Sequence, residues 1–147
     1  MKEKVKNIII FLIPTLIGLI SSFFVDKDFY SSINKPSFAP PSILFPIVWT
    51  ILYLLMGVSL YRIYKRNKNK TIVFGIQLFL NMLWVILFFK FNLFFISFIE
   101  LILLDTIILF IILDYYRLDK LSSYVLIPYL IWSCFASYLN WMIFLLN

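Results

Sequence analysis

Five long apolar runs constrain this 147-residue chain more than any other feature. Each has the roughly 17–25 residues that a helix needs to cross the hydrocarbon of a bilayer, and together they cover residues 8–25, 43–61, 71–89, 91–113 and 124–146. A transmembrane barrel is excluded, because its strands alternate at period two in blocks of roughly 10 residues. The chain is 63% hydrophobic and 14% charged, against roughly 45–50% and 25% in soluble domains. We therefore expect an all-α integral membrane protein, a single five-transmembrane-helix bundle over residues 1–147.

The basic residues predict how these helices are oriented. If the N-terminus lies inside, the Lys and Arg residues of segments 2–6, 62–70 and 117–120 fall on the inner side, and only Lys27, Lys35 and Lys90 fall outside. Inner loops carry such an excess, so we expect the N-terminus inside and the C-terminus outside. The net charge of +6 does not indicate nucleic-acid binding, because it comes from short loops beside spanning helices.

The chain contains no histidine and one cysteine, Cys134. Histidine is the commonest transition-metal ligand and the usual proximal ligand of haem, so we expect no metal site. Cys134 cannot form a disulfide within the chain, and its position in the middle of a helix predicts a buried, inert thiol.

Three of the runs carry aromatic and amide side chains at helical spacing. In the third run they are Gln77, Asn81, Trp84 and Phe88, at intervals of four, three and four, which places them on one helix face. Amides avoid lipid, so this face should point into the bundle and hydrogen-bond across helices. Matching faces occur at Trp49, Tyr53, Met56 and Leu60 in the second run, and at Trp132, Ala136 and Asn140 in the last run.

These faces are compatible with a helix-packing seam or with the wall of a pocket for a flat, apolar ligand. Tryptophan often anchors helix ends at the membrane interface. Trp49 and Trp132 lie about 10 Å or more inside the predicted ends of their helices, which interface anchoring explains less well. We therefore favour a cavity lined by these two indoles.

Glu100 and Asp105 are the only acids deep inside a run. Five residues apart on a helix, they differ by about 140° in direction and cannot act as a dyad. We expect structural roles for both, either neutral or hydrogen-bonded to a neighbouring helix, with proton-coupled transport as the alternative.

Segment 26–42 is the longest connection between runs. Its prolines and its aromatic residues Phe29, Tyr30 and Phe38 argue against disorder, so we expect it to form a roof over the helices beyond it. Gly57, and the pair Gly18 and Ser22, should allow close helix approach. Prolines inside two of the runs, Pro14 and Pro128, predict bends.

Three sequence blocks resemble the motifs of the TspO/MBR family. They are KPSFAPP followed by VWTILYLLMG, then QLFLNMLWVILFF at 77–89, then PYLIWSCFASYLN at 128–140. The blocks, their order and the five-span layout cover essentially the whole chain. The resemblance, to translocator proteins once called peripheral-type benzodiazepine receptors, implies a bacterial-type member in the cell membrane. It also implies a homodimer that contacts membrane lipid and takes a tetrapyrrole such as protoporphyrin IX as ligand or substrate, with no other cofactor.

Carried over by this resemblance, the ligand-binding positions are Tyr30, Pro40, Trp49, Asn81, Trp84, Phe88, Phe89, Trp132 and Ala136. Segment 26–42 becomes the lid of the pocket, Lys35 is expected to meet the propionates, and Glu100 takes the place of an acid that the family keeps. Phe29 and Phe38 stand where many relatives have tryptophan. No basic residue follows Tyr138, so cholesterol is not an expected ligand.

Three functions stay open at this point. The first is binding and sensing of a metal-free tetrapyrrole. The second is transport of a porphyrin or another amphipathic molecule, with Glu100 as a proton-linked switch, although the sequence has no internal repeat and no charged path. The third is light- and oxygen-dependent porphyrin breakdown, in which Trp49 and Trp132 would be the catalytic residues and no general acid or base is needed.

Overall fold

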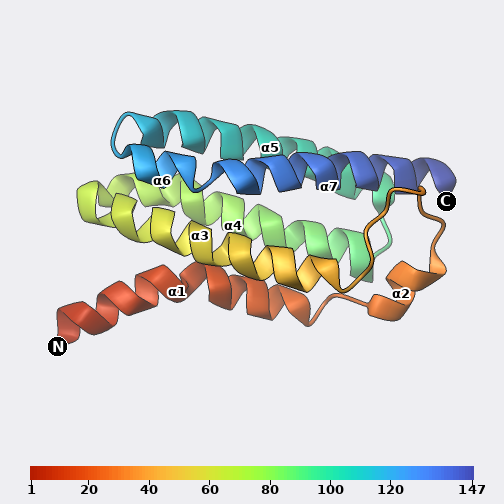
Figure 1. Cartoon of the computed structure of the whole chain (residues 1–147), viewed down its shortest axis with the longest axis horizontal. Coiled ribbons are helices and arrows are strands. Elements are labelled where there is room, and N and C mark those ends of the chain that lie inside the picture. Colours follow the sequence, from red (N-terminus) through yellow and green to blue (C-terminus); the bar gives the residue numbers. More distant parts are fainter.

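The structure, a computed structural model, describes residues 1–147 as helices joined by turns, with no strand. Five stretches are long and apolar enough to cross a membrane, and they are Lys2–Ser22, Leu44–Arg66, Lys68–Lys90, Phe94–Tyr116 and Lys120–Leu146. The long helices run side by side along the longest axis of the molecule (Figure 1). The prediction of an all-α bundle with five spans is confirmed, and the chain is an integral membrane protein.

Short helices and turns interrupt or connect the long ones. In chain order the elements are α1 (Lys2–Ser22), α2 (Lys27–Ser32), α3 (Leu44–Arg66), the 3₁₀ turn η1 (Lys68–Lys70), α4 (Thr71–Val85), the π-helical turn η2 (Ile86–Lys90), α5 (Phe94–Tyr116), α6 (Lys120–Tyr124) and α7 (Ile127–Leu146).

Several helices extend beyond the apolar runs that predicted them. The first begins at Lys2 instead of residue 8, and α3 continues to Arg66 instead of residue 61. Hydropathy detects only the part of a helix that lies in hydrocarbon, whereas charged residues continue the helix into the headgroup region. Lys65 and Arg66 occupy the last turn of α3, where a positive charge is favourable beside the negative end of the helix dipole.

Prolines act differently in the first and last spans. Pro14 lies inside α1, and this helix bends near its middle as predicted (Figure 1). The last span is divided instead of bent: α6 ends at Tyr124, and Pro128 lies in the first turn of α7. A proline costs nothing there, because the first N–H groups of a helix have no partner within the helix. The helix predicted over 124–146 therefore begins at Ile127, and Pro128 lies at its start instead of bending it.

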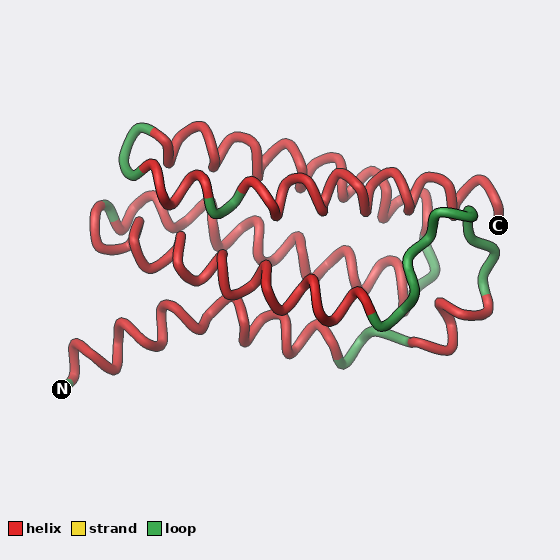
Figure 2. The backbone as a smooth tube through the Cα atoms, in the orientation of Figure 1, coloured by secondary structure: helices red, strands yellow, loops and turns green.

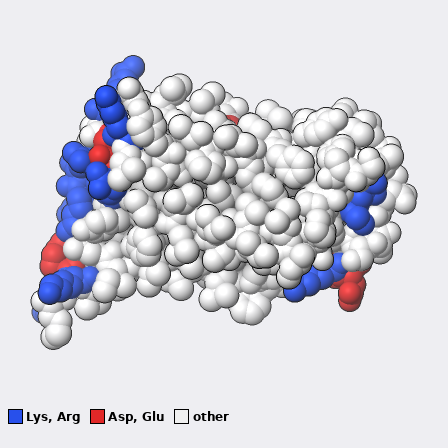
Figure 3. Space-filling model, viewed as in Figure 1, with Lys and Arg blue, Asp and Glu red and all other residues white.

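The two ends of the bundle differ in charge. Most Lys and Arg residues gather at the end that holds the N-terminus, and the middle of the molecule is almost free of charge (Figure 3). We call this end the basic end and the opposite one, which holds segment 26–42 and the C-terminus, the lid end. That the basic end lies inside stays a prediction from this asymmetry.

An ion-pair cluster fixes the basic end. Arg62 donates from Nε to Oδ2 of Asp119 at 2.6 Å and from Nη2 to Oδ1 at 3.0 Å, and Arg66 Nη2 lies 3.0 Å from Oδ1. The backbone N–H of Ser122 donates to the same carboxylate, which caps α6. The hydrogen bond from Arg62 lowers the pKa of Asp119. The cluster therefore ties α3 to the turn before α6.

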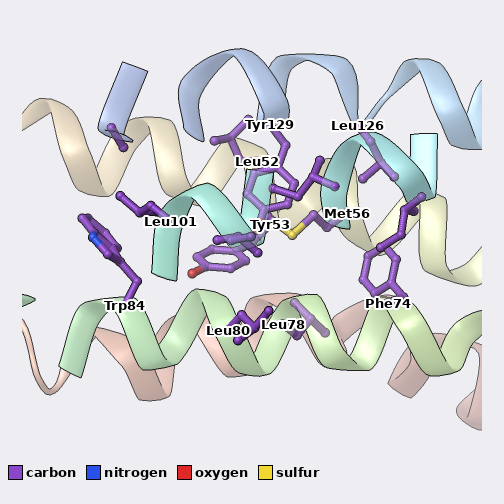
Figure 4. Close-up of a cluster of buried hydrophobic side chains, with 14 of the residues drawn as sticks. Leu52, Tyr53, Met56, Phe74, Leu78, Leu80, Trp84, Leu101, Leu126 and Tyr129 are labelled. Atoms are coloured by element: carbon purple, nitrogen blue, oxygen red, sulfur yellow. The ribbon is translucent and has the colours of Figure 1, made fainter. Parts of the chain in front are cut away.

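Close contact between α1 and α3 depends on glycine. A Cβ atom added at Gly57 would lie 2.2 Å from the carbonyl oxygen of Phe11, and one added at Gly18 would lie 2.3 Å from the ring of Tyr53. Both glycines therefore allow an approach that no side chain permits, as the sequence predicted. Deeper in the bundle, Tyr53, Met56 and Tyr129 point toward one another in the core (Figure 4).

The longest loop crosses the lid end between α2 and α3 (Figure 2). Segment 26–42, which we call the lid, begins with α2, a short helix that the sequence analysis did not predict. The Tyr30 hydroxyl donates to the carbonyl of Pro40 at 2.8 Å, and Phe38 stacks on Tyr138 of α7 with ring centroids 5.3 Å apart. Asn34 and the C-terminal Asn147 exchange hydrogen bonds of 3.1 and 2.8 Å. The first bond thus closes the lid on itself, and the other contacts attach it to α7 and the C-terminal residue.

Candidate functional site

A cavity of about 360 Å³ lies at the lid end between α1, α3 and α4. Gly18, Ser21 and Ser22 of α1 form one wall. The aromatic residues of the other walls are Phe45, Trp49 and Tyr53 of α3 with Trp84 and Phe89 of α4 and η2. Lys27 is the one charged residue in the lining, and it is exposed at the start of the lid. The volume lies in the lower part of the roughly 300–1,000 Å³ range of ligand pockets.

A second, nearly filled crevice adjoins this cavity. It measures about 20 Å³ and lies among the lid, η2 and α7, where Tyr30, Phe88 and Ala136 contribute to its lining. Phe45, Trp84 and Phe89 line both spaces and so form the partition between them. The Phe45 ring lies 5.3 Å from that of Tyr30 and 5.9 Å from that of Trp132, measured between centroids.

The turn η2 brings two consecutive aromatic rings to this partition. The rings of Phe88 and Phe89 lie 4.9 Å apart, and both line the crevice. The wider turn of a π-helix changes which residues share a face, and such turns are frequent at functional sites. The chain then reverses into α5 through Asn92, whose φ of 56° is in the left-handed region that asparagine tolerates.

Hydrogen bonds among buried side chains form the floor beneath the cavity. The Tyr53 hydroxyl donates to Asn81 Oδ1 at 2.5 Å, Asn81 Nδ2 donates to the Tyr129 hydroxyl at 3.0 Å, and Tyr129 donates to Gln77 Oε1 at 2.7 Å. This network joins α3, α4 and α7. The prediction that the amides of the third run face the interior and bond across helices is confirmed.

A second group of bonds fixes the orientation of Trp84. Its Nε1 donates to Asn140 Oδ1 at 3.0 Å, and Asn140 also accepts from Ser97 Oγ at 2.9 Å. Asn140 Nδ2 donates in turn to the carbonyl of Phe94 at 2.8 Å. The Trp49 ring lies 6.4 Å from Trp84 and 6.1 Å from Tyr129, between centroids, so these bonds hold one side of an aromatic wall in place.

The two acids of α5 have different surroundings. Glu100 is buried, and neither of its carboxyl oxygens has a hydrogen-bond partner in the chain. Asp105 accepts hydrogen bonds from Ser133 and Ser137 of α7, as expected for a structural group that bonds to a neighbouring helix. Neither acid lines the cavity or the crevice.

Comparison with known proteins decides the family. The model of the TspO/MBR family matches residues 10–146. The chain belongs to the TspO/MBR family. It is 38% identical over 140 residues to "Tryptophan-rich protein TspO" of Chlorobaculum tepidum, with 89% of each chain covered. It is also 30% identical over 142 residues to "Translocator protein" of Sus scrofa, covering 90% of this chain and 84% of that one.

A third relative bears on the role of the family. "Tryptophan-rich sensory protein" of Cereibacter sphaeroides is 29% identical over 122 residues, which cover 82% of this chain and 77% of that protein. The TspO/MBR resemblance drawn from the three motif blocks is therefore confirmed.

The positions that the TspO/MBR motifs suggested do not all reach the same space. Trp49, Trp84 and Phe89 line the cavity. Five of the positions line the crevice, and they are Tyr30, Trp84, Phe88, Phe89 and Ala136. The remaining three line neither space: Pro40 accepts the bond from Tyr30, Asn81 belongs to the floor network, and Trp132 packs behind Phe45.

Some features of the site were not found from the sequence. Phe45 precedes Trp49 by four residues and so continues its helix face, a signal that was present in the spacing but was not used. Tyr129 also carried a signal, because it continues the face of Trp132, Ala136 and Asn140 at a spacing of three.

Two side chains lie in surroundings that the sequence did not indicate. The Lys35 ammonium donates to the carbonyls of Tyr30 at 2.6 Å and Ile33 at 3.1 Å, so it stabilises the lid and does not line the cavity. The thiol of Cys134 is exposed on the surface of α7 instead of buried. Periodicity placed Cys134 within the helix, but one residue beyond Ser133 it turns away from the bundle interior.

Proposed function

We propose that this chain binds a tetrapyrrole of the protoporphyrin type and acts as a membrane sensor of it. The observation that carries the proposal is the cavity at the lid end, whose walls are the rings of Trp49, Trp84 and Phe89. Flat aromatic ligands stack on such rings, and each aromatic pair contributes about 0.5–1.5 kcal/mol beyond area burial. The name of the Cereibacter sphaeroides relative, "Tryptophan-rich sensory protein", supports the sensing part.

The charge at the cavity mouth suits an acidic ligand. Protoporphyrin carries two carboxylates on one edge of its ring system, and Lys27 is exposed where the cavity opens toward the lid. In the proposed complex the ring enters between α1 and α4 and its propionates stay near Lys27. This assignment replaces Lys35, whose ammonium is held by lid carbonyls.

Tryptophan fluorescence tests the proposal, because two indoles line the cavity and Trp141 does not. We expect saturable quenching when protoporphyrin IX is titrated into the chain in lipid nanodiscs, and about three- to tenfold weaker binding in Trp49→Phe, read from the Soret absorbance. The matched variant Trp141→Phe should bind as the native chain does. Absence of saturation, or equal affinity in Trp49→Phe, would contradict the proposed site.

Light-dependent breakdown of the bound porphyrin is a second candidate, favoured by the position of Trp49 in the cavity wall. An excited porphyrin and dioxygen produce oxidising species, and an indole in contact can donate an electron to them where phenylalanine cannot. Trp132 lies behind Phe45, so the two tryptophans should differ in effect.

Illumination of the bound complex in air tests this candidate. We expect the Soret band to disappear faster than for free porphyrin, and Trp49→Phe to slow the loss more than Trp132→Phe does, at equal occupancy. Equal rates with and without the protein would leave binding alone as the function.

A further inference from the structure

Asp105 occupies an unusual position for an acid in a membrane protein. It is the central residue of α5, eleven residues from Phe94 and from Tyr116, so about 16 Å of helix separates it from either end. It is also partly exposed on the surface of the bundle instead of facing the core. Acids in spans are expensive and nearly always face the interior or a partner. Because Asp105 departs from this rule, we expect another group to cover its carboxylate.

The carboxyl group of Asp105 is hydrogen-bonded to two serine hydroxyls of α7. Ser133 Oγ donates to Oδ1 at 2.5 Å, and Ser137 Oγ donates to Oδ2 at 2.6 Å. Each carboxyl oxygen thus contacts one hydroxyl, and the Ser137 hydroxyl also lies 3.1 Å from the carbonyl of Ser133. An ionised Asp105 can accept from both hydroxyls. The two hydroxyls are neutral, so they orient the carboxylate but do not neutralise a negative charge on it. No Lys or Arg of the chain forms an ion pair with Asp105.

A groove of about 370 Å³ opens beside this carboxylate on the surface between α5 and α7. Its apolar walls are Phe98, Ile102, Tyr138 and Trp141, and the rings of Phe98 and Trp141 lie 5.0 Å apart between centroids. Asp105 and Ser137 provide its polar lining, with Cys134 beside them. We call this space the Asp105 groove. It combines one anion with aromatic walls, and aromatic faces attract cations.

The chain itself cannot supply the missing positive charge. There is no histidine, and every Lys and Arg lies near an end of a span or in a connecting turn. A second copy of the chain, packed on this face with its helices crossing the membrane, would therefore bring no cation to the depth of Asp105. Water-soluble cations do not reach this depth either. The charge complementarity points to a cation that arrives dissolved in the bilayer.

We propose that the Asp105 groove binds a membrane-dissolved amphiphile with a cationic amine head and an apolar tail. The amine pairs with the carboxylate that Ser133 and Ser137 orient, and the tail lies along Phe98, Ile102 and Trp141. This site is separate from the cavity that we assign to the tetrapyrrole. Figure 1 shows α5 and α7 on one side of the bundle and α1 on the other, and the two sites favour ligands of opposite charge.

Bromine quenches tryptophan fluorescence on contact, so Trp141 is a natural reporter for the groove. The experiment titrates 12-bromododecylamine into the full chain in phosphatidylcholine nanodiscs, with 12-bromododecanol as the neutral probe of the same length. We expect saturable quenching by the amine, about tenfold or more weaker in Asp105→Asn. The alcohol should give only the weak, unsaturable quenching of a molecule that partitions into lipid, in both chains. Trp141→Phe should remove the saturable signal.

Three controls keep the test decisive. Asp114→Asn removes an acid from the end of the same helix, where it pairs with Lys70 at 3.0 Å, and should leave amine quenching unchanged. Ile102→Trp fills the groove while keeping Asp105. In the native chain, added dodecylamine should reduce the quenching by the brominated amine, and in Ile102→Trp it should have no such effect. Protoporphyrin binding, followed by Soret absorbance, should be the same in Asp105→Asn and in the native chain, which separates this proposal from the proposed function.

Two results would overturn the proposal. One is equal amine quenching in the native chain and Asp105→Asn. The other is absence of saturable amine quenching in the native chain. If the monomer–dimer equilibrium of Asp105→Asn in nanodiscs then also differs from that of the native chain, this face is assigned to contact between two copies of the chain.

Discussion

Phe45 determines the shape of the candidate site more than any other single residue. Its ring lies between the cavity of about 360 Å³ and the crevice of about 20 Å³, in contact with Tyr30 of the lid and Trp132 of α7. A ligand as large as a porphyrin needs more room than the cavity alone offers, so this ring has to move when the ligand enters. Part of the binding free energy is then used to move it.

The substitution Phe45→Ala should therefore tighten protoporphyrin binding. Without the ring the two spaces join, and the cost of moving it out of its preferred rotamer, about 0.5–1.5 kcal/mol, disappears. This corresponds to an affinity about two- to tenfold higher. Titration by Soret absorbance measures it, with the lipid-facing Phe95→Ala as the control that should bind as the native chain does. Weaker binding by Phe45→Ala would show that the ring supports the ligand instead of excluding it.

At the scale of elements, the wall between α1 and α3 depends on backbone contact. Gly57 of α3 lies against the carbonyl of Phe11, and Gly18 of α1 lies against the ring of Tyr53, which also donates to Asn81. Helix packing in a membrane depends on such close approach, because lipid tails are as apolar as the side chains and the hydrophobic effect does not drive helices together. The cavity keeps its α1 wall only if this contact holds.

Two glycine substitutions with opposite expected signs test this wall. Gly57→Ala places a Cβ 2.2 Å from a backbone oxygen, so α1 must shift, and we expect a loss of about 1–3 kcal/mol in the free energy of unfolding. At Gly75 of α4 nothing lies within 4 Å of an added Cβ, so Gly75→Ala should stabilise the chain by up to about 1 kcal/mol through helix propensity. Thermal unfolding in the same detergent measures both. A native-like Tm for Gly57→Ala would contradict the close contact.

At the scale of the whole molecule, the sequence predicted the spans and the interior faces well. Apolar runs of spanning length admit few folds, and amides such as Gln77 and Asn81 can only face inward when lipid surrounds the helix. Small residues at Gly18 and Gly57 predicted close packing for the same reason. These features depend on local spacing and on the bilayer, both of which can be evaluated from one sequence.

The arrangement of the site depended on contacts that spacing does not encode. Which lysine faces the cavity follows from the path of the lid, where Lys35 bonds to carbonyls and Lys27 stays exposed. The partition at Phe45 follows from side-chain packing between the lid, α3 and α7. The division of the last span into α6 and α7 follows from the cap at Asp119 and from Pro128 at the new helix start.

The most direct test of the central claim is the protoporphyrin affinity of a chain whose cavity mouth is closed. Ser22 is exposed and lines the cavity, so the indole of Ser22→Trp can cover the mouth without entering the core. The matched variant Thr106→Trp adds the same ring to the exposed surface of α5. Our account predicts that Ser22→Trp binds protoporphyrin IX about tenfold or more weakly in a Soret titration in nanodiscs, whereas Thr106→Trp binds as the native chain does. Equal affinity in all three chains would contradict the assignment of this cavity as the tetrapyrrole site.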